Sequence, residues 1–534
     1  MVPYDFTWIF ALGIVTSICD AYGIGANDVS NSFASSISSG SLSMMQACII
    51  ASFTEFLGAF LLGAETTETI KGGILSAELF VPQPELLMLA MLCALVGSAS
   101  WVIFASKIGA PVSSTHAIVG GLIGTGIAAF GGGAIKWSFD GVGKIILSWF
   151  VSPIVSGVIT SIIYLPTRYF ILENPNSLKR GILAVPIYFF CTALIGSFYI
   201  IYKAVPSDKT NGLSAGAIVG ISFGVAAVVT AFSWFFFVPW IKRRVIGKEN
   251  LRWYHMFAVH FVKYRPMPPT PSPEPNTDDP SKLESGNCVE IQGKVDVGNK
   301  QCDDFDDNAA ETSAVDVSPW YIKTLRLVKY YALRGMKQDV RNLDNDKLTE
   351  IHNAAKKFDD DTEYLFSFLQ VITACLASFA HGSNDVSNAA GPISAIYDTW
   401  KTGRVDISGE NPVPKWVLAM AGGAIVLGLL TLGYHVMRRV GNGITYLTPS
   451  RGFSAELGAS LTVLTASQLG LPVSTTLCLV GSVVFVGLCN GNLRAINWRT
   501  VGLCFGSWMI TLPIAGLISG LLFAFASNAP NKTV

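Results

Sequence analysis

The amino-acid sequence predicts an all-α polytopic membrane protein with about twelve membrane segments, arranged as two inverted-topology repeats with broken or re-entrant helices. Three observations predict this class. Hydrophobic residues make up 51% of the 534 residues and charged residues only 14%, whereas an ordinary soluble protein has about 25% charged residues. The apolar residues occur in runs of about 20, the length that a helix needs to cross roughly 30 Å of hydrocarbon. Two polar motifs each occur twice, once in either half of the chain.

Twelve apolar runs are candidate membrane spans, seven before a charged central segment and five after it. Only helices and closed barrels satisfy their backbone hydrogen bonds in lipid, and these runs are too long and continuous for barrel strands. Clusters of Gly, Pro and Ser or Thr interrupt several runs, which is typical of broken or re-entrant helices. The candidate spans lie at 6–26, 42–63, 86–106, 112–131, 143–165, 182–204, 212–240, 364–392, 414–436, 453–470, 472–490 and 501–526.

The central segment, 241–362, differs in composition from the rest of the chain. It carries a large share of the charged residues and a proline-rich run at 266–273. Because it has too little apolar surface to bury, we predict that it is largely disordered. It separates an N-terminal membrane block, 1–240, which holds the first repeat, from a C-terminal block, 363–534, which holds the second. Aromatic and basic residues at 320–341 predict either a helix on the inner membrane surface or a merely solvated juxtamembrane helix.

The distribution of charge predicts the orientation of the chain. Lys and Arg gather in loops that share one side of the membrane if the runs alternate. Such loops favour the cytoplasm, so we expect the central segment to be cytoplasmic and both termini to be extracellular. The formal net charge is +0, which gives no reason to expect a nucleic-acid partner. The sequence contains no Gly-x4-Gly-Lys-Ser/Thr phosphate loop, so it predicts neither an enzyme nor an ATP-driven pump, and no cofactor.

The first repeated motif contains an Asn–Asp pair. It reads Gly-Ala-Asn-Asp-Val-Ser-Asn at 25–31 and Gly-Ser-Asn-Asp-Val-Ser-Asn at 382–388. An ionisable Asp in a membrane segment costs about 2.5–3.5 kcal/mol on insertion scales, so it needs a partner, and a cation is the simplest one. Hard oxygen ligands suit Na⁺ or a proton better than a soft metal. We predict a cation site, with sodium as the metal, formed by Asn27, Asp28, Asn384 and Asp385 and extended by Asn31 and Asn388.

The second repeated motif is Pro-Val-Ser-Ser/Thr-Thr, at 111–115 and 472–476. Gly, then Pro, then hydroxyl residues before an apolar run predict a helix start, where free N–H groups and a partial positive charge suit a phosphate-like anion. Ser and Thr in membrane helices also bond to the backbone or hold helices together. Two copies, each paired with an Asn–Asp motif, favour binding. The residues predicted to bind this phosphate-like anion are Ser113, Ser114, Thr115, Ser474, Thr475 and Thr476.

The two kinds of motif predict interdependent binding of anion and cation. The apolar runs contain almost no Lys or Arg, so the positive charge that an anion requires must come from cations bound beside it. When neither ion is stable in the site alone, the binding of one favours the other, which is the thermodynamic basis of symport.

Two glutamates also lie in apolar runs, Glu55 and Glu456. They do not occupy equivalent positions in the two copies, because an alignment of 51–63 on 421–433 places Ile425 opposite Glu55. A buried carboxylate in a membrane span predicts a coupling-ion or proton site, so we expect both to couple cation movement to the substrate. The alternative is an internal hydrogen-bonded group that stiffens the bundle.

These motifs resemble the signature of the inorganic phosphate transporter (PiT) family, the sodium- or proton-coupled phosphate permeases. Thr-Glu-Phe-Leu-Gly at 54–58 and Thr-Pro-Ser-Arg-Gly-Phe at 448–453 are also similar to the family, and 492–499 resembles fungal-type members. The resemblance implies an inverted repeat, a homodimer and import of phosphate with cations, usually sodium, across the plasma membrane. One departure is visible: family members often have His where this chain has Leu477.

Two alternatives remain open at the level of sequence. The first is a transporter of another oxyanion, such as sulfate or arsenate, since the hydroxyl motifs suit any tetrahedral anion. The second is a non-transporting phosphate receptor that signals through the central segment at 241–362.

Overall fold

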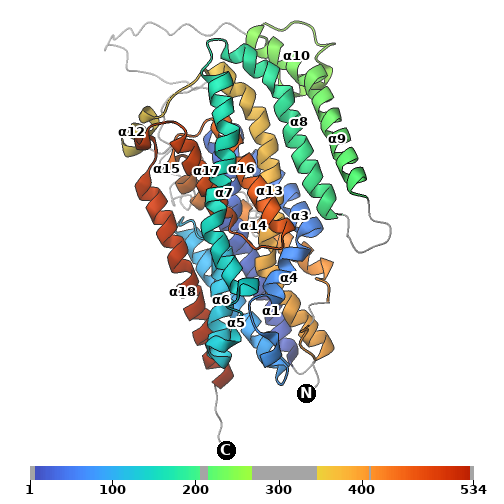
Figure 1. Cartoon of the computed structure of the whole chain (residues 1–534), viewed down its shortest axis with the longest axis vertical. Helices are drawn as coiled ribbons and strands as arrows, with labels where there is room; N and C mark the ends of the chain where they lie inside the picture. Colours follow the sequence, from blue (N-terminus) through green and yellow to red (C-terminus); the bar gives the residue numbers. More distant parts are fainter. Residues whose placement is uncertain (1–5, 205–213, 267–345, 408–410, 529–534) are drawn as a thin grey trace, which may run out of the picture.

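The protein is a long bundle of helices (Figure 1). The computed structural model describes residues 6–204, 214–266, 346–407 and 411–528, and within them it has no strand, only three isolated bridges. The all-α class is therefore confirmed. The helices are α1 (Thr7–Ile24), α2 (Ser30–Ser38), α3 (Met44–Leu62), α4 (Ala64–Gly72), α5 (Pro84–Lys107), α6 (Ser114–Phe130), α7 (Lys144–Pro166), α8 (Ser177–Ala204), α9 (Ala215–Phe232), α10 (Val238–Ile241), α12 (Asp346–Ala354), α13 (Asp360–Thr402), α14 (Lys415–Leu432), α15 (Tyr434–Ile444), α16 (Pro449–Gln468), α17 (Thr475–Leu488) and α18 (Trp498–Asn528).

Within the described part of the chain, nine helical segments are long and apolar enough to cross a membrane. The three remaining runs of the predicted twelve are α6, α16 and α17. α6 has 17 residues and α17 has 14, which is short for a span of about 20 residues. α16 is a continuous helix, but Arg451, Glu456 and many hydroxyl residues lower its apolar character. The three runs are helical, as expected, but none of them meets the requirements for a span by itself.

The two repeats run in opposite directions. α1 and α2 form one segment of 32 residues, Thr7–Ser38, and α13 lies against it from end to end. The Trp400 Nε1 donates to the Thr7 hydroxyl (3.1 Å), near the start of the first segment and the end of α13. The Ser39 hydroxyl, just past α2, donates to Gln370 near the start of α13 (2.6 Å). The two corresponding helices are therefore antiparallel, as an inverted repeat requires.

Each repeat contributes a helical hairpin, α5–α6 in the first and α16–α17 in the second. Figure 1 places the first hairpin in the lower half of the bundle and the second in the upper half. The turns contain Gly109 (φ 69°) and Gly470 (φ 62°), a backbone region that glycine adopts without steric cost. A proline follows two residues later in both turns, at 111 and 472. The repeated sequence thus folds into repeated structure.

Glycines allow the two repeats to pack closely across the middle of the bundle. A Cβ atom at Gly25 would overlap the carbonyl oxygen of Ile425, and a Cβ atom at Gly382 would overlap that of Glu55. Each Asn–Asp helix therefore crosses the second span of the opposite repeat at the same point. This packing places Ile425 as the counterpart of Glu55, which agrees with the sequence alignment.

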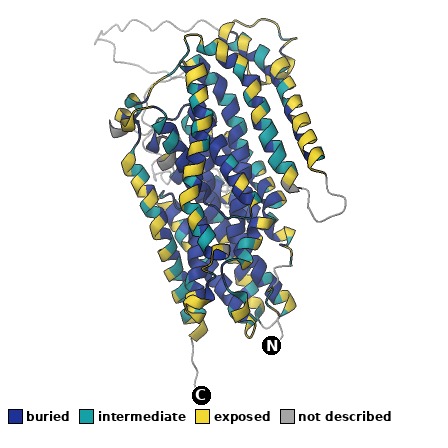
Figure 2. Cartoon of the chain, viewed as in Figure 1, coloured by how far each residue is buried: buried dark blue, intermediate teal, exposed yellow. Residues whose placement is uncertain are grey.

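The outer surface of the bundle is apolar. Figure 2 shows exposed residues along the outer helices around a buried centre. The exposed side chains include Phe53, Val228 and Leu521, each at least 67% exposed. Such a surface is unfavourable in water but suits lipid, where burial in protein is not needed. The chain is a membrane protein with several apolar helices.

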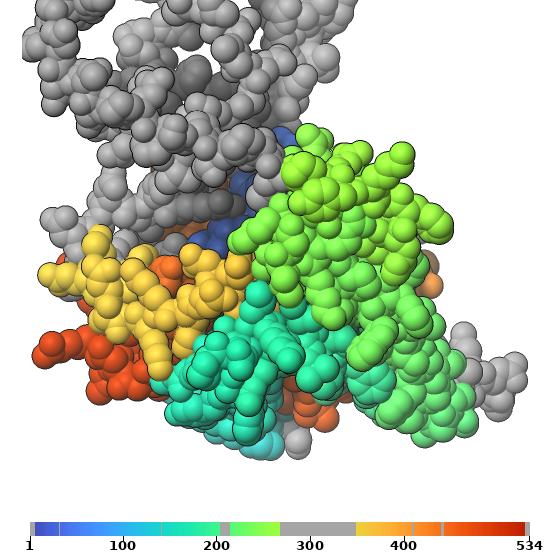
Figure 3. Space-filling view, turned by 90° about the horizontal axis from the view of Figure 1, so that it is seen from above, coloured from blue at the N-terminus to red at the C-terminus, as the bar shows by residue number. Residues whose placement is uncertain are grey.

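Helices α8, α9 and α10 lie outside the repeated elements, at one edge of the molecule (Figure 1). Figure 3 shows the end of the molecule at which 215–266, in green, forms one side of the surface. Only the edges of the central segment, 241–266 and 346–362, fall within the described residues. The predicted disorder of the rest, and the expected surface helix at 320–341, concern residues that the structure does not describe.

Candidate functional site

Two aspartates from opposite repeats meet in the centre of the bundle. Asp28 lies in a π-helical turn, Gly25–Val29, between α1 and α2, and Asp385 lies within α13. Side-chain ligand atoms of Asp28, Asp385 and His381 all lie within 4.8 Å of one another. All three side chains are at most 2% exposed. The structure thus brings together the two carboxylates that the sequence singled out.

The hydroxyls of α17 bond to both aspartates. The Thr475 hydroxyl donates to Asp385 Oδ2 (2.6 Å), which belongs to its own repeat. The Thr476 hydroxyl donates to Asp28 Oδ1 (2.8 Å), which belongs to the other repeat. The start of one short helix is therefore placed between two carboxylates, with one bond across the repeat boundary.

The start of α6 makes the matching connection. The backbone N–H of Ser114 donates to Asp28 Oδ2 (3.3 Å) in its own repeat. The Asn388 side-chain amide of the other repeat donates to the hydroxyls of Ser114 (3.0 Å) and Thr115 (3.2 Å). The predicted carboxylate and hydroxyl groups of both repeats thus form one cluster, which we call the central cluster: Asp28, Ser114, Thr115, His381, Asp385, Asn388, Thr475 and Thr476.

Two of the six predicted hydroxyl residues cap their helices. Ser113 Oγ accepts from the N–H of His116, and Ser474 Oγ accepts from the N–H of Leu477, both at 3.3 Å. These caps satisfy amides of the first helical turn. Because the bond uses only the backbone of the residue after the motif, Leu477 in place of His does not alter the cap. The His116 ring packs against Trp149, with 3.8 Å between ring centroids, as a structural side chain does.

The asparagines next to the two aspartates hold the hairpins. Asn27 Nδ2 donates to the Ser106 hydroxyl (3.1 Å) and to the Ala110 carbonyl (3.0 Å), while the Val112 N–H donates to Asn27 Oδ1 (3.0 Å). Both ends of this amide are therefore bonded to the turn between α5 and α6. The amide fixes the hairpin against the broken helix, and its role as a cation ligand stays a prediction.

The second repeat has the same arrangement around Asn384. Its side chain contacts the Ser467 hydroxyl (2.9 Å) and the Leu471 carbonyl (3.3 Å) in the turn before α17. The side chain of Asn31, the counterpart of Asn388, lies outside the described residues. Its predicted part in the cation site therefore has no structural test here.

Glu55 reaches the central cluster through a histidine that the sequence analysis did not identify. Glu55 Oε2 lies 2.8 Å from His381 Nδ1, and Asp385 Oδ2 lies 2.8 Å from His381 Nε2. The Ser378 hydroxyl donates to the other Glu55 oxygen (2.7 Å). His381 stands four residues before Asp385 on the same helix face, so a histidine at that spacing inside an apolar run was the available signal.

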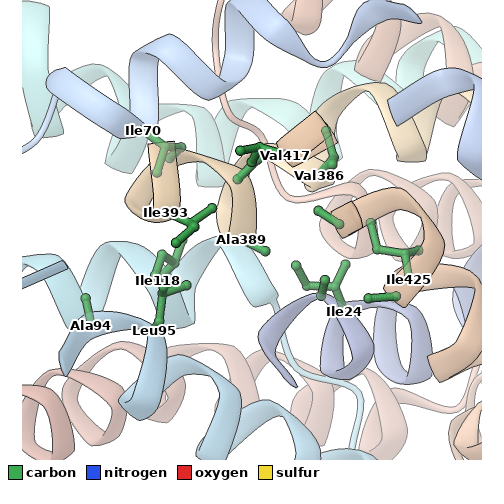
Figure 4. Packing of buried hydrophobic residues seen from close by; sticks show 14 of the residues in the cluster. Ile24, Ile70, Ala94, Leu95, Ile118, Val386, Ala389, Ile393, Val417 and Ile425 are labelled. Carbon is green, nitrogen blue, oxygen red and sulfur yellow. The ribbon is translucent and has the colours of Figure 1, made fainter. Parts of the chain in front are cut away.

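The other repeat has no such chain of polar groups. Ile24 immediately precedes Gly25, as His381 precedes Gly382, and Ile425 stands in the place of Glu55. Figure 4 shows Ile24 and Ile425 in an apolar cluster. The two aspartates therefore have different surroundings, because only Asp385 lies 2.8 Å from the imidazole of His381, whose other nitrogen contacts Glu55.

Glu456 lies in a separate polar network. Its oxygens accept hydrogen bonds from the hydroxyls of Ser35 (2.6 Å), Ser36 (2.5 Å) and Thr373 (2.7 Å) and from the Gln370 amide (3.1 Å). These donors come from α2 and α13, and none belongs to the central cluster. The structure thus brings Glu55, but not Glu456, into the chain of contacts that ends at Asp385.

The position that corresponds to Glu456 in the first repeat is apolar. Leu95 precedes Gly97 by the same interval as Glu456 precedes Gly458, and Figure 4 shows Leu95 beside Ile118. Like Glu55, Glu456 therefore has no acidic counterpart.

The central cluster offers carboxylates, an imidazole, hydroxyls and the first turns of two helices in a space closed to water. Carboxylate and hydroxyl oxygens suit a small hard cation, and helix starts suit an oxyanion. The described side chains of the cluster are at most 9% exposed. The conformation is therefore closed toward both ends of the bundle.

A protein family, individual relatives and a solved structure were each found to be similar to this chain, and the three comparisons agree. Residues 24–519 match the phosphate transporter family. The phosphate-repressible phosphate permease pho-4 of Neurospora crassa is 36% identical, over 99% of this chain and 99% of that protein. The sodium-dependent phosphate transporter 1 of Mus musculus is 30% identical, over 98% and 95%. A solved structure of a sodium-dependent phosphate transporter matches with a TM-score of 0.67 and 27% identity, over 97% and 99% of the two chains.

Proposed function

The chain belongs to the phosphate transporter family, and from this premise we propose that its central cluster binds inorganic phosphate together with the cations that drive its import. Its similarity extends over almost the full length of a phosphate permease and of sodium-dependent phosphate transporters. Import of inorganic phosphate coupled to a cation is therefore its function, and it is a transporter rather than an enzyme. We favour sodium as the coupling ion, since the mouse relative is named for sodium dependence.

One observation supports this site above the others. Asp28 and Asp385 come from opposite repeats, yet each accepts a hydrogen bond from the first turn of α17. A site made from both repeats changes shape when one repeat moves against the other, which is the basis of alternating access. Cations at the carboxylates would supply the positive charge that phosphate needs at the starts of α6 and α17.

The interdependence of the ions gives the coupling. Without phosphate, cations beyond those that the two carboxylates neutralise would leave uncompensated positive charge in the buried site. Without cations, an anion would face Asp28 and Asp385 directly, which is unfavourable at this depth. Only the loaded site is electrostatically balanced, so neither ion moves down its gradient alone.

The remaining features of the proposal follow from charge and family. The protein would act in the plasma membrane, with both termini outside and the segment 241–362 in the cytoplasm. The described ends, near residues 6 and 528, lie at the same end of the bundle (Figure 1), which supports the expected placement of the termini on one side. We also expect a homodimer, with contacts through apolar outer helices.

The first test replaces a single carboxylate. Asp28→Asn keeps the size of the side chain and removes the charge, so sodium-dependent uptake of labelled phosphate should fall to background. Surface labelling should find the variant in the membrane at the normal level. Uptake at the wild-type rate by this variant would remove Asp28 from the cation site.

The second test addresses phosphate. Replacing Thr475 and Thr476 together by Val removes the hydroxyls that bond to the two aspartates. A hydrogen bond to a charged group contributes about 1.5–3 kcal/mol, so the KM for phosphate should rise roughly ten- to hundredfold. Thr462→Val is the control, since this hydroxyl bonds to a carbonyl of its own helix. An unchanged KM in the double variant would place phosphate elsewhere.

The third test identifies the ions. Purified protein in liposomes should take up phosphate under an imposed Na⁺ gradient and not under a pH gradient alone. Sulfate in excess should leave uptake of labelled phosphate unchanged, whereas arsenate, which has the same shape and charge, should compete. Uptake driven by the pH gradient alone would assign the coupling to protons.

A further inference from the structure

A second acidic position lies on α1, about two helical turns before Asp28. Asp20 is completely buried, and within the described residues neither of its carboxylate oxygens has a hydrogen-bond partner. The hydroxyl of Ser98 on α5 is also completely buried and lies close enough to the Asp20 carboxylate to interact with it. Like the carboxylate oxygens, it forms no hydrogen bond of normal geometry within the described residues. The established polar networks around Glu55 and Glu456 do not include either residue.

The fold does not require polar groups at these two positions. Asp20 precedes Gly25 by the same interval as Ala377 precedes Gly382, so Ala377 is its counterpart in the second repeat. Ser98 follows Gly97 as Ala459 follows Gly458.

The second correspondence is also visible in the packing. Gly97 faces Ser519 of α18, and Gly458 faces Thr160 of α7, so the two glycines sit at equivalent helix crossings. Where the second repeat packs two alanines, the first repeat buries a carboxylate and a hydroxyl instead.

A buried carboxylate in a membrane span is retained for what it binds. Alanine fills the corresponding position in the other repeat, so packing alone does not explain why the first repeat has an aspartate here. Two carboxylate oxygens and a hydroxyl, all hard oxygen ligands without a protein partner, suit a small monovalent cation. The charge of Asp20 also lies close enough to that of Asp28 for the two to interact.

We propose that Asp20 and Ser98 form an additional site for one monovalent cation, Na⁺ or H⁺, which is co-transported with the contents of the central cluster. This inference rests on the proposed function of that cluster. A cation at Asp20 neutralises this buried carboxylate and removes its repulsion of the Asp28 carboxylate. The first repeat then holds one more cation than the second, in which alanines take these positions.

The test counts cations for each phosphate transported. The Asp20→Ala/Ser98→Ala variant carries the residues that the second repeat already packs, so it should fold. In liposomes, simultaneous uptake of labelled sodium and labelled phosphate should give one cation fewer per phosphate than in the wild type. If sodium per phosphate is unchanged, an internal pH dye should show one proton fewer, which also supports the site and assigns it to H⁺. Asp20→Asn should behave in the same way.

A binding measurement covers the case in which the variant does not transport. Purified wild-type protein in detergent should bind one more Na⁺ at saturation, or take up one more proton from solution on titration with phosphate, than the double variant. Ser519→Ala is the matched control, because this buried hydroxyl is also unpartnered but faces Gly97 rather than Asp20. Its cation count should equal that of the wild type.

Equal cation counts in wild type and double variant, in both transport and binding, would overturn the proposal. This result is distinct from failure of the proposed function. Loss of the central site is judged by Asp28→Asn, whereas the Asp20 site is judged by the difference in count between proteins that retain Asp28.

Discussion

At the scale of residues, the unequal surroundings of the two aspartates are the main finding. Asp385 adjoins His381, which in turn contacts Glu55. The same positions near Asp28 are filled by Ile24 and an isoleucine of α14. The two repeats share their scaffold, their aspartates and the hydroxyl motifs, but only Asp385 is paired with a histidine that contacts a glutamate. We infer that the two halves of the site have different tasks in coupling.

This asymmetry predicts how substitutions of His381 and Glu55 change the free energy of unfolding. His381→Ile leaves Glu55 buried without its partner, which should cost about 3–5 kcal/mol, as removal of one member of a buried ion pair does. Glu55→Ile alone should also destabilise. The double variant carries isoleucine at both positions, as the protein already does with Ile24 and Ile425 near Asp28, so it should be more stable than the His381→Ile variant.

The measurement is unfolding of purified protein in detergent, as a double-mutant cycle. Loss of uptake in the double variant, with stability recovered, would show that the pair serves transport rather than packing. Strictly additive destabilisation would contradict the expected coupling of the two side chains.

At the scale of elements, the site depends on helices that are interrupted at the right depth. A π-helical turn carries Asp28 between α1 and α2, and such turns are frequent at functional sites. The two hairpins start their second helices beside the aspartates, where the amides and hydroxyls of a first turn are available. A continuous helix at α6 or α17 would bond these amides internally and leave no site.

The close crossings of the repeats predict the effect of added side-chain volume. Gly25→Ala and Gly382→Ala each place a methyl group against a backbone carbonyl of the opposite repeat. Overpacking of this kind costs about 1–3 kcal/mol, and here it also separates the halves of the site. Both variants should lower thermal stability and uptake.

Gly423→Ala on α14 is the control for these variants. No atom lies within 4 Å of a Cβ added there, and Ala favours a helix over Gly by up to about 1 kcal/mol. This variant should be as stable as the wild type or more so. If Gly25→Ala has the same small effect as Gly423→Ala, the two helices are not closely packed at that crossing.

At the scale of the whole molecule, two repeats of opposite direction form one enclosed site. Hydrogen bonds cross the boundary in both directions, from Thr476 to Asp28 and from Asn388 to Ser114. Opening the site toward either side must break some of these bonds. New contacts to the bound ions and to water can replace the hydrogen bonds that are lost when the site opens.

The enclosed site predicts that each ligand stabilises the protein only in the presence of the other. Phosphate at about 100 times its dissociation constant should stabilise the folded state by about 2.7 kcal/mol when Na⁺ is present. In choline buffer the same phosphate concentration should give little stabilisation. Thermal unfolding of purified protein measures both, and Asp28→Asn should lose the effect. Equal stabilisation in the two buffers would contradict interdependent binding.

The sequence by itself determined the class of fold, the duplication and most of the groups in the site. Apolar runs of membrane length fix helices, and the exact repetition of Asn–Asp and Pro-Val-Ser motifs pairs Asp28 with Asp385 without reference to a structure. The alignment that places Ile425 opposite Glu55 also came from sequence alone, and the packing of glycines agrees with it.

Only the tertiary structure decided which of these groups meet. Contacts across the repeats depend on how antiparallel helices pack, and no local pattern encodes that. Sequence therefore treated Glu55 and Glu456 alike, although one reaches the aspartates through His381 and the other is enclosed by hydroxyl and amide donors. It also gave no reason to connect Asp20 with Ser98, because a carboxylate without a partner is recognisable only when all of its neighbours are in place.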